Sequence, residues 1–383
     1  MAAITGLGMA GLVRRQTLTA TQLALEAVDS ALLDAGLELR DIDGLYVSRS
    51  HVAEDTSLGL GLAAMAGLHD LSALQYVDGE GTSALQQVMN AAMAVTAGLC
   101  RHVVCVYSDA PLRTGLSSSE AFNTTKSRGG MRDLRYRSGA FGGAAVYAFA
   151  ARRHMALYGT REEDFGAVAT SARAWASRSP HAIFREPMSM TDYLASRRIA
   201  EPLRLFDCAV PVDGAIAVVV SAPDAARTLR QPPVNVLGFG QGHPGWPRQA
   251  PFEPDVTTGA AIARQKAFEM AGVGLADIDM AQFYDAFTLM TLVALEEYGF
   301  CKKGQAGAFV REGNIAPGGK LPVNTGGGHL SGYYVQGMTP ISEAVMQLRG
   351  QAGDRQCANA RVALVTNEGG HFDHHACAVL GAA

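Results

Sequence analysis

One stretch of this sequence occurs twice, and this repeat limits the possible folds more than any other feature. The first copy, from Ala31, reads ALLDAGLELRDIDGLYVS, and the second, from Ala267, reads AFEMAGVGLADIDMAQFY. Both copies contain Ala-Gly and then Asp-Ile-Asp, at one constant offset. Apolar residues at helical spacing precede each copy, and a short apolar strand follows each. A repeated helix–strand unit predicts two α/β halves of similar topology. The alternative is two ordinary doubly wound domains that resemble each other by chance.

The segments around the repeat extend the same pattern. Strand-like runs with glycine precede the two copies, at 3–8 and 234–240. Helical runs at 81–97 and 341–348 each end near a glycine and lead to a continuous apolar strand. Such strands suit a sheet that helices cover on both faces. The sequence therefore predicts an α/β fold in which layers of helices and sheets are stacked.

The first half contains surplus sequence at about 110–203. A polar stretch rich in Ser, Gly and Arg comes first, and helical segments follow it. We interpret this region as an insertion that could cap a site, because long loops in compact domains are often functional. A dimer-contact arm is the alternative. The predicted halves are residues 1–230, which include the inserted region, and residues 231–383.

Composition excludes several classes of protein. The chain has 383 residues, 48% of them hydrophobic, which is enough for a large core. Its net charge of −4 gives no reason to expect a nucleic-acid or anionic-membrane partner. The six cysteines lack CxxC or zinc-ligand spacing, and neither a signal peptide nor a membrane-spanning run occurs, so we expect a cytoplasmic protein. Without a P-loop or a dinucleotide fingerprint, no tightly bound cofactor is expected.

Several motifs resemble those of one known family. The runs GFCKKG at 299–304 and PVNTGGG at 322–328 resemble the second half of a thiolase, closest to the sterol-carrier or lipid-transfer branch. The run PLRLFDC at 202–208, followed by DGA at 213–215, resembles the end of that branch's first half. The resemblance extends over nearly the whole chain and is weakest in the inserted region. It implies a thiolase-like layered αβαβα fold.

The positions that carry thiolase chemistry hold no cysteine in this sequence. By the resemblance, the nucleophilic cysteine of the C-x-x-G motif falls on Asp78, and the Gly-His-Pro histidine falls on Tyr334. The second thiolase cysteine falls on Asn367. The branch's His-Asp-Cys-Phe segment reads YDAF here, from Tyr284 to Phe287. Two tyrosines therefore replace two functional groups of a thiolase.

This pattern resembles the thiolase-like aldolases of bacterial steroid side-chain degradation. These are acyl-CoA retro-aldolases that work with a small DUF35-type (OB-fold) partner protein. The resemblance implies that Tyr284 and Tyr334 carry the catalysis and that coenzyme A enters as part of the substrate. It implies a homodimer core, and with the partner a heterotetramer. The implied substrate is a 17-hydroxysteroid 20-carboxyl-CoA, which gives a 17-ketosteroid and propionyl-CoA.

The chemistry of the residues favours the same reaction independently. Thiolytic cleavage needs a nucleophile that accepts the acyl group. Retro-aldol cleavage of a β-hydroxyacyl thioester needs a base for the hydroxyl proton, and then stabilisation and protonation of the enolate. Tyrosine, with a reference pKa of about 10, is a fair donor and a poor base, and lowering its pKa by three units takes roughly 4 kcal/mol. Which tyrosine serves the hydroxyl and which the enolate stays open.

Other residues are candidates for supporting roles. Asp78 could be an active-site acid or hold a water molecule, or it could only begin a helix. Asp285 and Asn367 belong to the motifs that carry the resemblance. His371 and His329 could line the pocket. The histidine-rich run that begins at His371 could suggest a metal site, but thiolase-like chemistry requires no metal and none is expected.

The two tyrosines also have a purely structural interpretation. Tyr284 could be a buried aromatic residue whose hydroxyl is satisfied by the core. Tyr333 and Tyr334 are adjacent, so we expect one side chain to point into the core and Tyr334 to face the site.

Two alternative functions remain for a chain of this kind. One is a variant thiolase that cleaves a β-ketoacyl-CoA with a relocated nucleophile, which a cysteine trapped as an acyl-enzyme would support. The other is a non-catalytic acyl-CoA or lipid-binding scaffold subunit, which tight binding of acyl-CoA without turnover would support.

Overall fold

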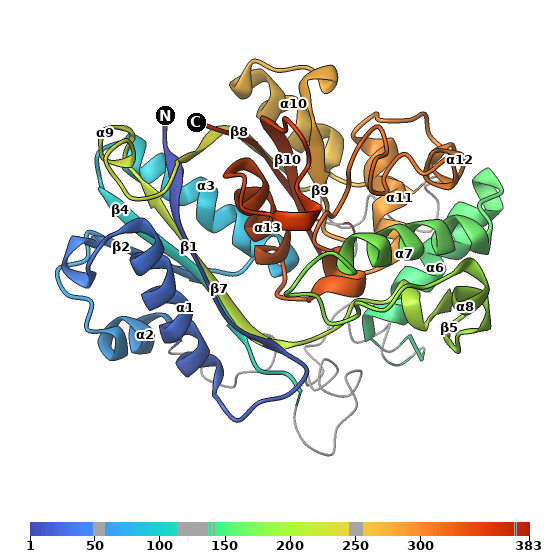
Figure 1. The fold of residues 1–383 in the computed structure, drawn as a ribbon, viewed down its shortest axis with the longest axis horizontal. Helices are drawn as coiled ribbons and strands as arrows, with labels where there is room; N and C mark the ends of the chain where they lie inside the picture. The colour runs from blue at the N-terminus through green and yellow to red at the C-terminus, as the bar shows by residue number, and fades with distance from the viewer. Residues whose placement is uncertain are drawn as a thin grey trace.

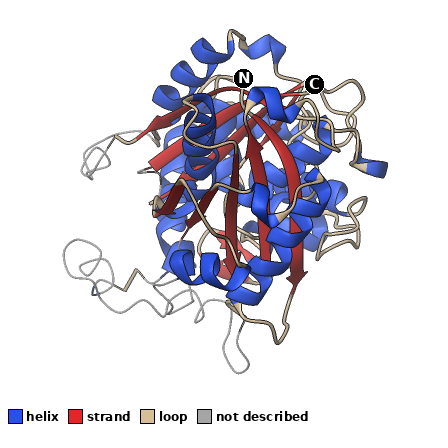
Figure 2. Cartoon of the chain, turned by 90° about the vertical axis from the view of Figure 1, so that its left-hand side faces the viewer, coloured by secondary structure: helices blue, strands red, loops and turns tan. Residues whose placement is uncertain are grey.

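The computed structural model describes residues 1–48, 58–112, 137, 139–140, 142–244, 256–370, 372 and 374–383. It shows helices packed around one large sheet (Figures 1 and 2). The strands of the large sheet are β1 (Ala3–Val13), β2 (Gly44–Ser48), β3 (Ala73–Val77), β4 (His102–Asp109), β7 (Asp213–Ser221), β8 (Val234–Gly242), β9 (Met280–Gln282), β10 (Val362–Gly369) and β11 (His374–Gly381). A small second sheet contains β5 (Arg198–Ala200) and β6 (Leu203–Arg204).

The helices are α1 (Ala20–Ala35), α2 (Leu58–Ala66), α3 (Ser83–Thr96), α6 (Gly142–Tyr158), α7 (Glu162–Ala176), α8 (Met190–Ala195), α9 (Pro223–Ala226), α10 (Ala260–Ala271), α11 (Thr288–Glu297), α12 (Ala306–Arg311) and α13 (Met338–Leu348). Short 3₁₀ turns are η1 (Leu39–Asp41), η2 (Glu80–Thr82), η3 (Leu205–Asp207), η4 (Leu275–Asp277) and η6 (Gly353–Arg355), and η5 (Gly328–Gly332) is a π-helical turn.

The order of strands in the large sheet contains the same unit twice. The order is β3-β2-β4-β7-β1-β8-β11-β10-β9, so that β9, β10, β11 and β8 repeat β2, β4, β7 and β1 in reverse. The corresponding pairs run in the same relative directions: β2–β4 and β9–β10 are parallel, and β4–β7 and β10–β11 are antiparallel. The two units meet where β1 pairs with β8. The boundary between residues 230 and 231 stays a prediction.

The repeated Asp-Ile-Asp has the same structural task in both copies. The first aspartate accepts a backbone N–H at the start of its own 3₁₀ turn, at 2.8 Å for Asp41 and 2.7 Å for Asp277. The second aspartate, Asp43 or Asp279, accepts two consecutive N–H groups of the segment that leads into the neighbouring parallel strand. The motif therefore joins the 3₁₀ turn before one strand to the start of the neighbouring parallel strand.

The repeated Ala-Gly marks the end of a helix. Gly36 follows α1 with φ of 75°, and Gly272 follows α10 with φ of 67°. This left-handed conformation strains a residue with a Cβ, which is why glycine ends so many helices.

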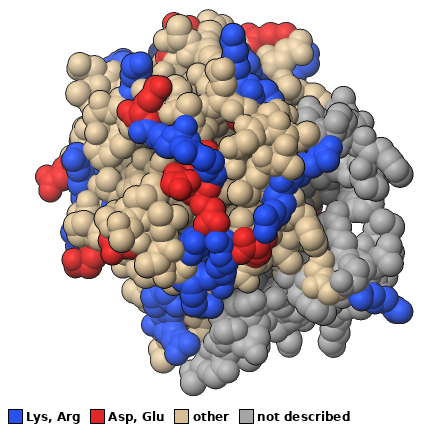
Figure 3. Space-filling model, turned by 90° about the vertical axis from the view of Figure 1, so that its right-hand side faces the viewer, with Lys and Arg blue, Asp and Glu red and all other residues tan. Residues whose placement is uncertain are grey.

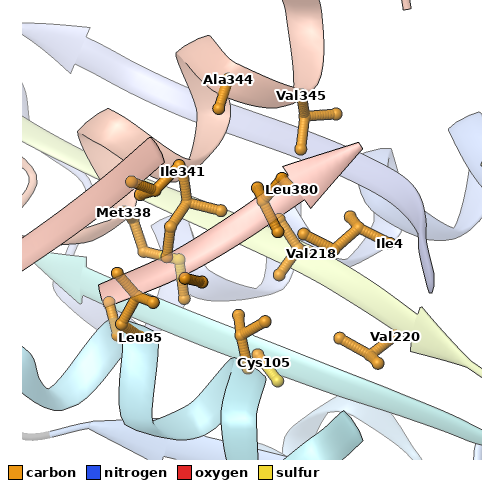
Figure 4. Packing of buried hydrophobic residues seen from close by; sticks show 14 of the residues in the cluster. Ile4, Leu85, Cys105, Val218, Val220, Met338, Ile341, Ala344, Val345 and Leu380 are labelled. Carbon is orange, nitrogen blue, oxygen red and sulfur yellow. The ribbon is translucent and has the colours of Figure 1, made fainter. Parts of the chain in front are cut away.

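Apolar side chains separate the layers of helix and sheet. Alternate residues of β7 face opposite sides: residues 215, 217 and 219 pack with α1, and residues 216, 218 and 220 pack with α3 and α13. Figure 4 shows the second group, where Met338 and Ile341 of α13 and Leu85 of α3 point toward β7 and β11. Every residue of α13 is buried. The α/β class and the stacking of helices and sheets expected from the sequence are confirmed.

The described part of the inserted region is largely helical. It supplies α6, α7 and α8, whose apolar side chains share one cluster with α10 and α11 on the outer face of the second repeat unit. Ion pairs cross its surface: Arg198 and Arg204 both contact Glu162, while Arg152 and Arg198 contact Glu201. Figure 3 shows this side of the molecule, where basic and acidic side chains are interspersed. No helix in the described ranges is both long and apolar enough to cross a membrane.

Candidate active site

Tyr284 and Tyr334 lie together although 50 residues separate them in sequence. Tyr284 lies in the loop between β9 and α11, and Tyr334 follows the π-helical turn η5. Their hydroxyl oxygens are 2.8 Å apart, and the two rings meet edge to face. Tyr284 is 6% exposed, whereas Tyr334 is half-buried. Tyr333 points the other way, into the central apolar cluster, with its hydroxyl 3.1 Å from Ser342 Oγ.

A segment that precedes β7 holds both tyrosine loops in place through its backbone. The Ala209 N–H donates to the Ala286 carbonyl at 2.9 Å, two residues after Tyr284. The Val210 N–H donates to the His329 carbonyl at 2.8 Å, and the Tyr334 N–H donates to the Val210 carbonyl at 3.0 Å. The two loops are therefore positioned against one common segment of the first repeat unit.

A buried carboxylate fixes the start of the helix that follows Tyr284. Asp207 accepts from Thr288 Oγ1 at 2.6 Å, from the Tyr193 hydroxyl at 2.8 Å and from the Arg204 N–H at 2.6 Å. Burial raises the pKa of Asp207, and these hydrogen bonds oppose the rise. Since Thr288 is the first residue of α11, the contact limits movement of the Tyr284 loop.

His329 lies between the two tyrosine rings. Its ring centroid is 4.6 Å from that of Tyr284 and 4.9 Å from that of Tyr334. Nδ1 accepts the Asp285 N–H at 3.2 Å, and Nε2 lies 2.8 Å from the Gln336 carbonyl, to which it donates. Burial lowers the pKa of His329 to about 3, so the imidazole is neutral. Both nitrogens of His329 are therefore engaged, and its ring packs against both tyrosines.

Asp285 and His329 bind each other through their backbones as well. The His329 N–H donates to Asp285 Oδ1 at 2.7 Å, which makes the contact between the two loops reciprocal. Burial raises the pKa of Asp285 to about 7, against the effect of its hydrogen bonds. Asp285 therefore connects the loop that carries Tyr284 to the turn that precedes Tyr334.

Burial also raises the pKa of both tyrosines. The pKa of Tyr284 is well above 10, because the site is desolvated and a negative charge on Tyr334 would lie close by. The pKa of Tyr334 is raised to about 12, mainly by burial, although its hydrogen bond with Tyr284 opposes this effect. Both side chains are therefore neutral phenols suited to donating a proton.

The other predicted site residues lie in different environments. Asn367 is fully buried, where its side-chain oxygen accepts the Leu85 N–H at 3.1 Å and its amide donates to the Gly337 carbonyl at 3.2 Å. Asn367 thus connects the first turn of α3 to the loop after Tyr334. Asp78 is exposed at the end of β3, just before η2. His371 lies outside the described residues.

Sequence analysis missed two residues that the fold brings to the site. Tyr147 of α6 is 7% exposed, and its hydroxyl donates to Glu368 Oε1 at 3.4 Å. Nothing in the sequence near Tyr147 indicates this position. For Glu368 a signal exists: it follows Thr366 by two residues in β10, so both face the same side of the strand. Thr366 Oγ1 accepts the Tyr284 N–H at 3.3 Å.

Residues 248–382 match the family described as "Thiolase C-terminal domain-like". The chain is 37% identical to 17-hydroxy-3-oxo-4-pregnene-20-carboxyl-CoA lyase of Mycobacterium tuberculosis, over 91% of this chain and 92% of that protein. It is 36% identical to a steroid side-chain-cleaving aldolase of Thermomonospora curvata, over 92% of each. Among solved structures, an Ltp2-ChsH2(DUF35) aldolase superposes with a TM-score of 0.89 and 34% identity, covering 100% of this chain and 97% of that one.

Proposed function

This chain belongs to the thiolase-like steroid side-chain-cleaving aldolases, and we propose that it cleaves a 17-hydroxysteroid 20-carboxyl-CoA into a 17-ketosteroid and propionyl-CoA. The relative from Mycobacterium tuberculosis is named for a substrate of this class. Coenzyme A then enters as the thioester of the substrate. The observation that carries the proposal is the pair formed by Tyr284 and Tyr334, with hydroxyl oxygens 2.8 Å apart.

The cysteines of the chain support a reaction without a thiol nucleophile. A nucleophilic cysteine needs a lowered pKa, because the thiolate is the reactive form. Burial raises the pKa of all six cysteines, to about 12 for Cys208 and Cys301, the two that are half-buried. None of them contacts the tyrosine pair by hydrogen bond in the described part of the chain.

The proposed mechanism is a retro-aldol cleavage. Removal of the proton from the 17-hydroxyl turns that oxygen into the ketone oxygen as the C17–C20 bond breaks. The electron pair of this bond moves into the enolate of propionyl-CoA. A proton then returns to C20 and gives propionyl-CoA, so neither water nor free coenzyme A is consumed. One tyrosine serves the hydroxyl and the other the enolate.

Product analysis tests this reaction. The chain, with its DUF35-type partner, is incubated with a 17-hydroxysteroid 20-carboxyl-CoA, and the products are identified by mass spectrometry. We expect equal amounts of 17-ketosteroid and propionyl-CoA without added coenzyme A. Products that form only when free coenzyme A is added would indicate a thiolase. Bound substrate without any product would indicate a scaffold subunit.

The assembly is part of the proposal. One solved relative is an aldolase with a DUF35 component, and we infer a DUF35-type partner of the OB fold for this chain. A homodimer core is supported by β3, which ends the sheet and pairs only with β2 among the described strands. Leu74 and Tyr76 of this strand are 37% and 47% exposed, and an unprotected edge strand favours association. Light scattering of the two-protein complex should give the mass of a heterotetramer.

A further inference from the structure

The place of Tyr334 in the site depends on the short turn that precedes it. In η5 the Gly332 N–H donates to the Gly327 carbonyl and the Tyr333 N–H donates to the Gly328 carbonyl, both five residues back and both at 3.1 Å. Turns of this π-helical kind are rare and occur frequently at functional sites. The position of the Tyr334 hydroxyl therefore depends on the contacts that hold η5 from outside.

The inserted region supplies such contacts. The Ile183 N–H donates to the Gly332 carbonyl at 2.9 Å, and the Phe184 N–H donates to the Ser331 carbonyl at 3.0 Å. Residues 183–186, which we call the strap, thus begin against the last two residues of η5. The strap can hold the turn only if the strap is itself held in place.

Arg173 of α7 joins the strap to the turn. Its Nε donates to Ser331 Oγ at 3.1 Å, and its Nη1 donates to the Glu186 carbonyl at 3.1 Å. The guanidinium also lies over the ring of Phe184, 5.0 Å from the ring centroid. Because the guanidinium is a rigid plane with donors in fixed directions, these three contacts fix Ser331 and the strap relative to each other.

The same guanidinium reaches the support of the other tyrosine. It lies 5.1 Å from the centroid of the Phe206 ring, which meets the Phe184 ring edge to face at 6.5 Å. Phe206 directly precedes Asp207, the carboxylate that binds Thr288 at the start of the helix after Tyr284. One side chain therefore contacts the supports of both tyrosine loops.

The charge of Arg173 is not used in an ion pair within the described ranges. The residue is 6% exposed, burial lowers its pKa, and its Nη2 has no hydrogen-bond partner among the described residues. The faces of the two phenyl rings offset part of the lost hydration. An apolar side chain would fill this space without the cost of burying a charge. What the guanidinium adds is the direction of its hydrogen bonds.

From this arrangement we propose that Arg173 is a positioning residue for the reaction: it holds Ser331, and with it the turn that places the Tyr334 hydroxyl 2.8 Å from that of Tyr284. This proposal rests on the retro-aldol function. Arg173 exchanges no proton with the substrate and acts only through the geometry of the tyrosine pair. The site is complete only when α7 of the inserted region lies against η5.

The first test compares Arg173→Met and Arg173→Lys by initial rates of propionyl-CoA release, in the complex with the partner. Met keeps much of the length of Arg without any N–H group, and Lys keeps the charge without the fork of donors. We expect kcat to fall about tenfold or more for Met and less for Lys, with KM within about threefold, because a displacement of about 1 Å can cost about 100-fold in rate. Wild-type kcat in both variants would overturn the proposal.

A double-mutant cycle tests whether Arg173 acts through Ser331. Ser331→Ala removes the oxygen that accepts from Nε, and it should lower kcat in the wild-type background. In the Arg173→Met background the same change should lower kcat by no more than about twofold, since the shared contact is already lost. If the two losses multiply, Arg173 does not act through Ser331. Should Arg173→Met fail to fold, Arg173→Lys takes its place in the cycle.

Amide hydrogen exchange of the substrate-free protein separates positioning from general stability. Arg173→Met should speed exchange in peptides that cover residues 328–335 and the strap, and leave the rest of the chain unchanged. The matched control is His154→Gln, because His154 is a fully buried residue of the inserted region that lies within 2.7 Å of Thr160 Oγ1 and 3.2 Å of Glu296 Oε2. The control should lower the free energy of unfolding and leave kcat and the exchange of η5 unchanged.

Faster exchange spread over the whole chain in Arg173→Met would show a general loss of stability and would overturn the proposal. The exchange experiment needs no turnover, so it remains decisive for the hold on η5 whatever the reaction is. If the wild-type complex releases no propionyl-CoA while exchange changes only around η5, it is the retro-aldol function that fails.

Discussion

Removal of one hydroxyl group separates the catalytic role of Tyr334 from its role in packing. Tyr334→Phe leaves the ring in place and removes the oxygen that lies 2.8 Å from the Tyr284 hydroxyl. The adjacent Tyr333→Phe is a matched control, because it removes a hydroxyl 3.1 Å from Ser342 Oγ on the opposite side of the chain. Only the first change alters the proposed proton path.

The two variants should differ in turnover far more than in stability. Each loses the hydrogen bonding of a largely buried hydroxyl, which costs about 1–2 kcal/mol of unfolding free energy in either case. Loss of a catalytic acid or base lowers kcat by about 10²–10⁴-fold, which raises the activation barrier by about 3–5 kcal/mol. Tyr334→Phe should therefore lose at least 100-fold in kcat, while Tyr333→Phe stays within about threefold of wild type.

Initial rates of propionyl-CoA release and urea unfolding of the same preparations check both statements. The assay uses saturating steroid-CoA thioester and an excess of the partner protein, so that weakened assembly does not lower kcat. If Tyr334→Phe keeps kcat within threefold of wild type, or if both variants lose the same activity, the tyrosine pair does not carry the reaction.

Three further perturbations test other parts of the molecule. Gly81→Ala should lower kcat at least tenfold, because the new Cβ would overlap the Glu368 carbonyl oxygen and press on the Tyr284 hydroxyl oxygen at 2.9 Å. Gly274→Ala, with the nearest atom at 3.6 Å, should leave rates unchanged. His375→Gln should make the protein more resistant to acid. Burial lowers the pKa of His375 from 6.5 to about 3, so the unfolded chain binds the extra proton and wild type loses stability as pH falls from about 6.5 toward 3. Urea unfolding at pH 7 and pH 5 should show that the free energy of unfolding falls by about 2 kcal/mol less in this variant than in wild type over this pH range. An equal fall in both proteins would contradict the lowered pKa of His375. Alkylation of accessible thiols with iodoacetamide should leave kcat unchanged, since burial keeps the cysteines protonated. Inactivation by iodoacetamide, together with an acylated cysteine in the mass spectrum of unalkylated protein incubated with substrate, would favour a thiolase.

The repeat shows how much of the fold could be predicted from the sequence. The shared Ala-Gly marked equivalent positions, and in the structure Gly36 and Gly272 both end a helix in the left-handed conformation. The aspartates at 43 and 279 marked equivalent positions, although the N–H groups that they bind lie about 60 and 80 residues further along the chain. The repeated Asp-Ile-Asp indicated that Asp43 and Asp279 occupy equivalent positions in the two units. Only the folded sheet shows which backbone N–H groups they bind.

The site could be predicted in part. The resemblance gave Tyr284 and Tyr334 at equivalent motif positions, and the structure places their hydroxyls together. It pointed to Asn367 and not to Glu368, although both lie in β10. The pleat decides between them: Asn367 faces α3, and Glu368 faces Tyr147 on the other side of β10. Tyr147 could not be predicted, because the inserted region carries no motif.

The sequence by itself determined the two-unit α/β architecture and the replacement of cysteine by tyrosine, since both depend on residue identity and local spacing. The tertiary structure alone decided the protonation of the site. The pKa values of Tyr284 and Tyr334 are raised because strands and helices from both repeat units exclude water from the two rings. Desolvation depends on everything that surrounds a group, and no local pattern in the sequence records that environment.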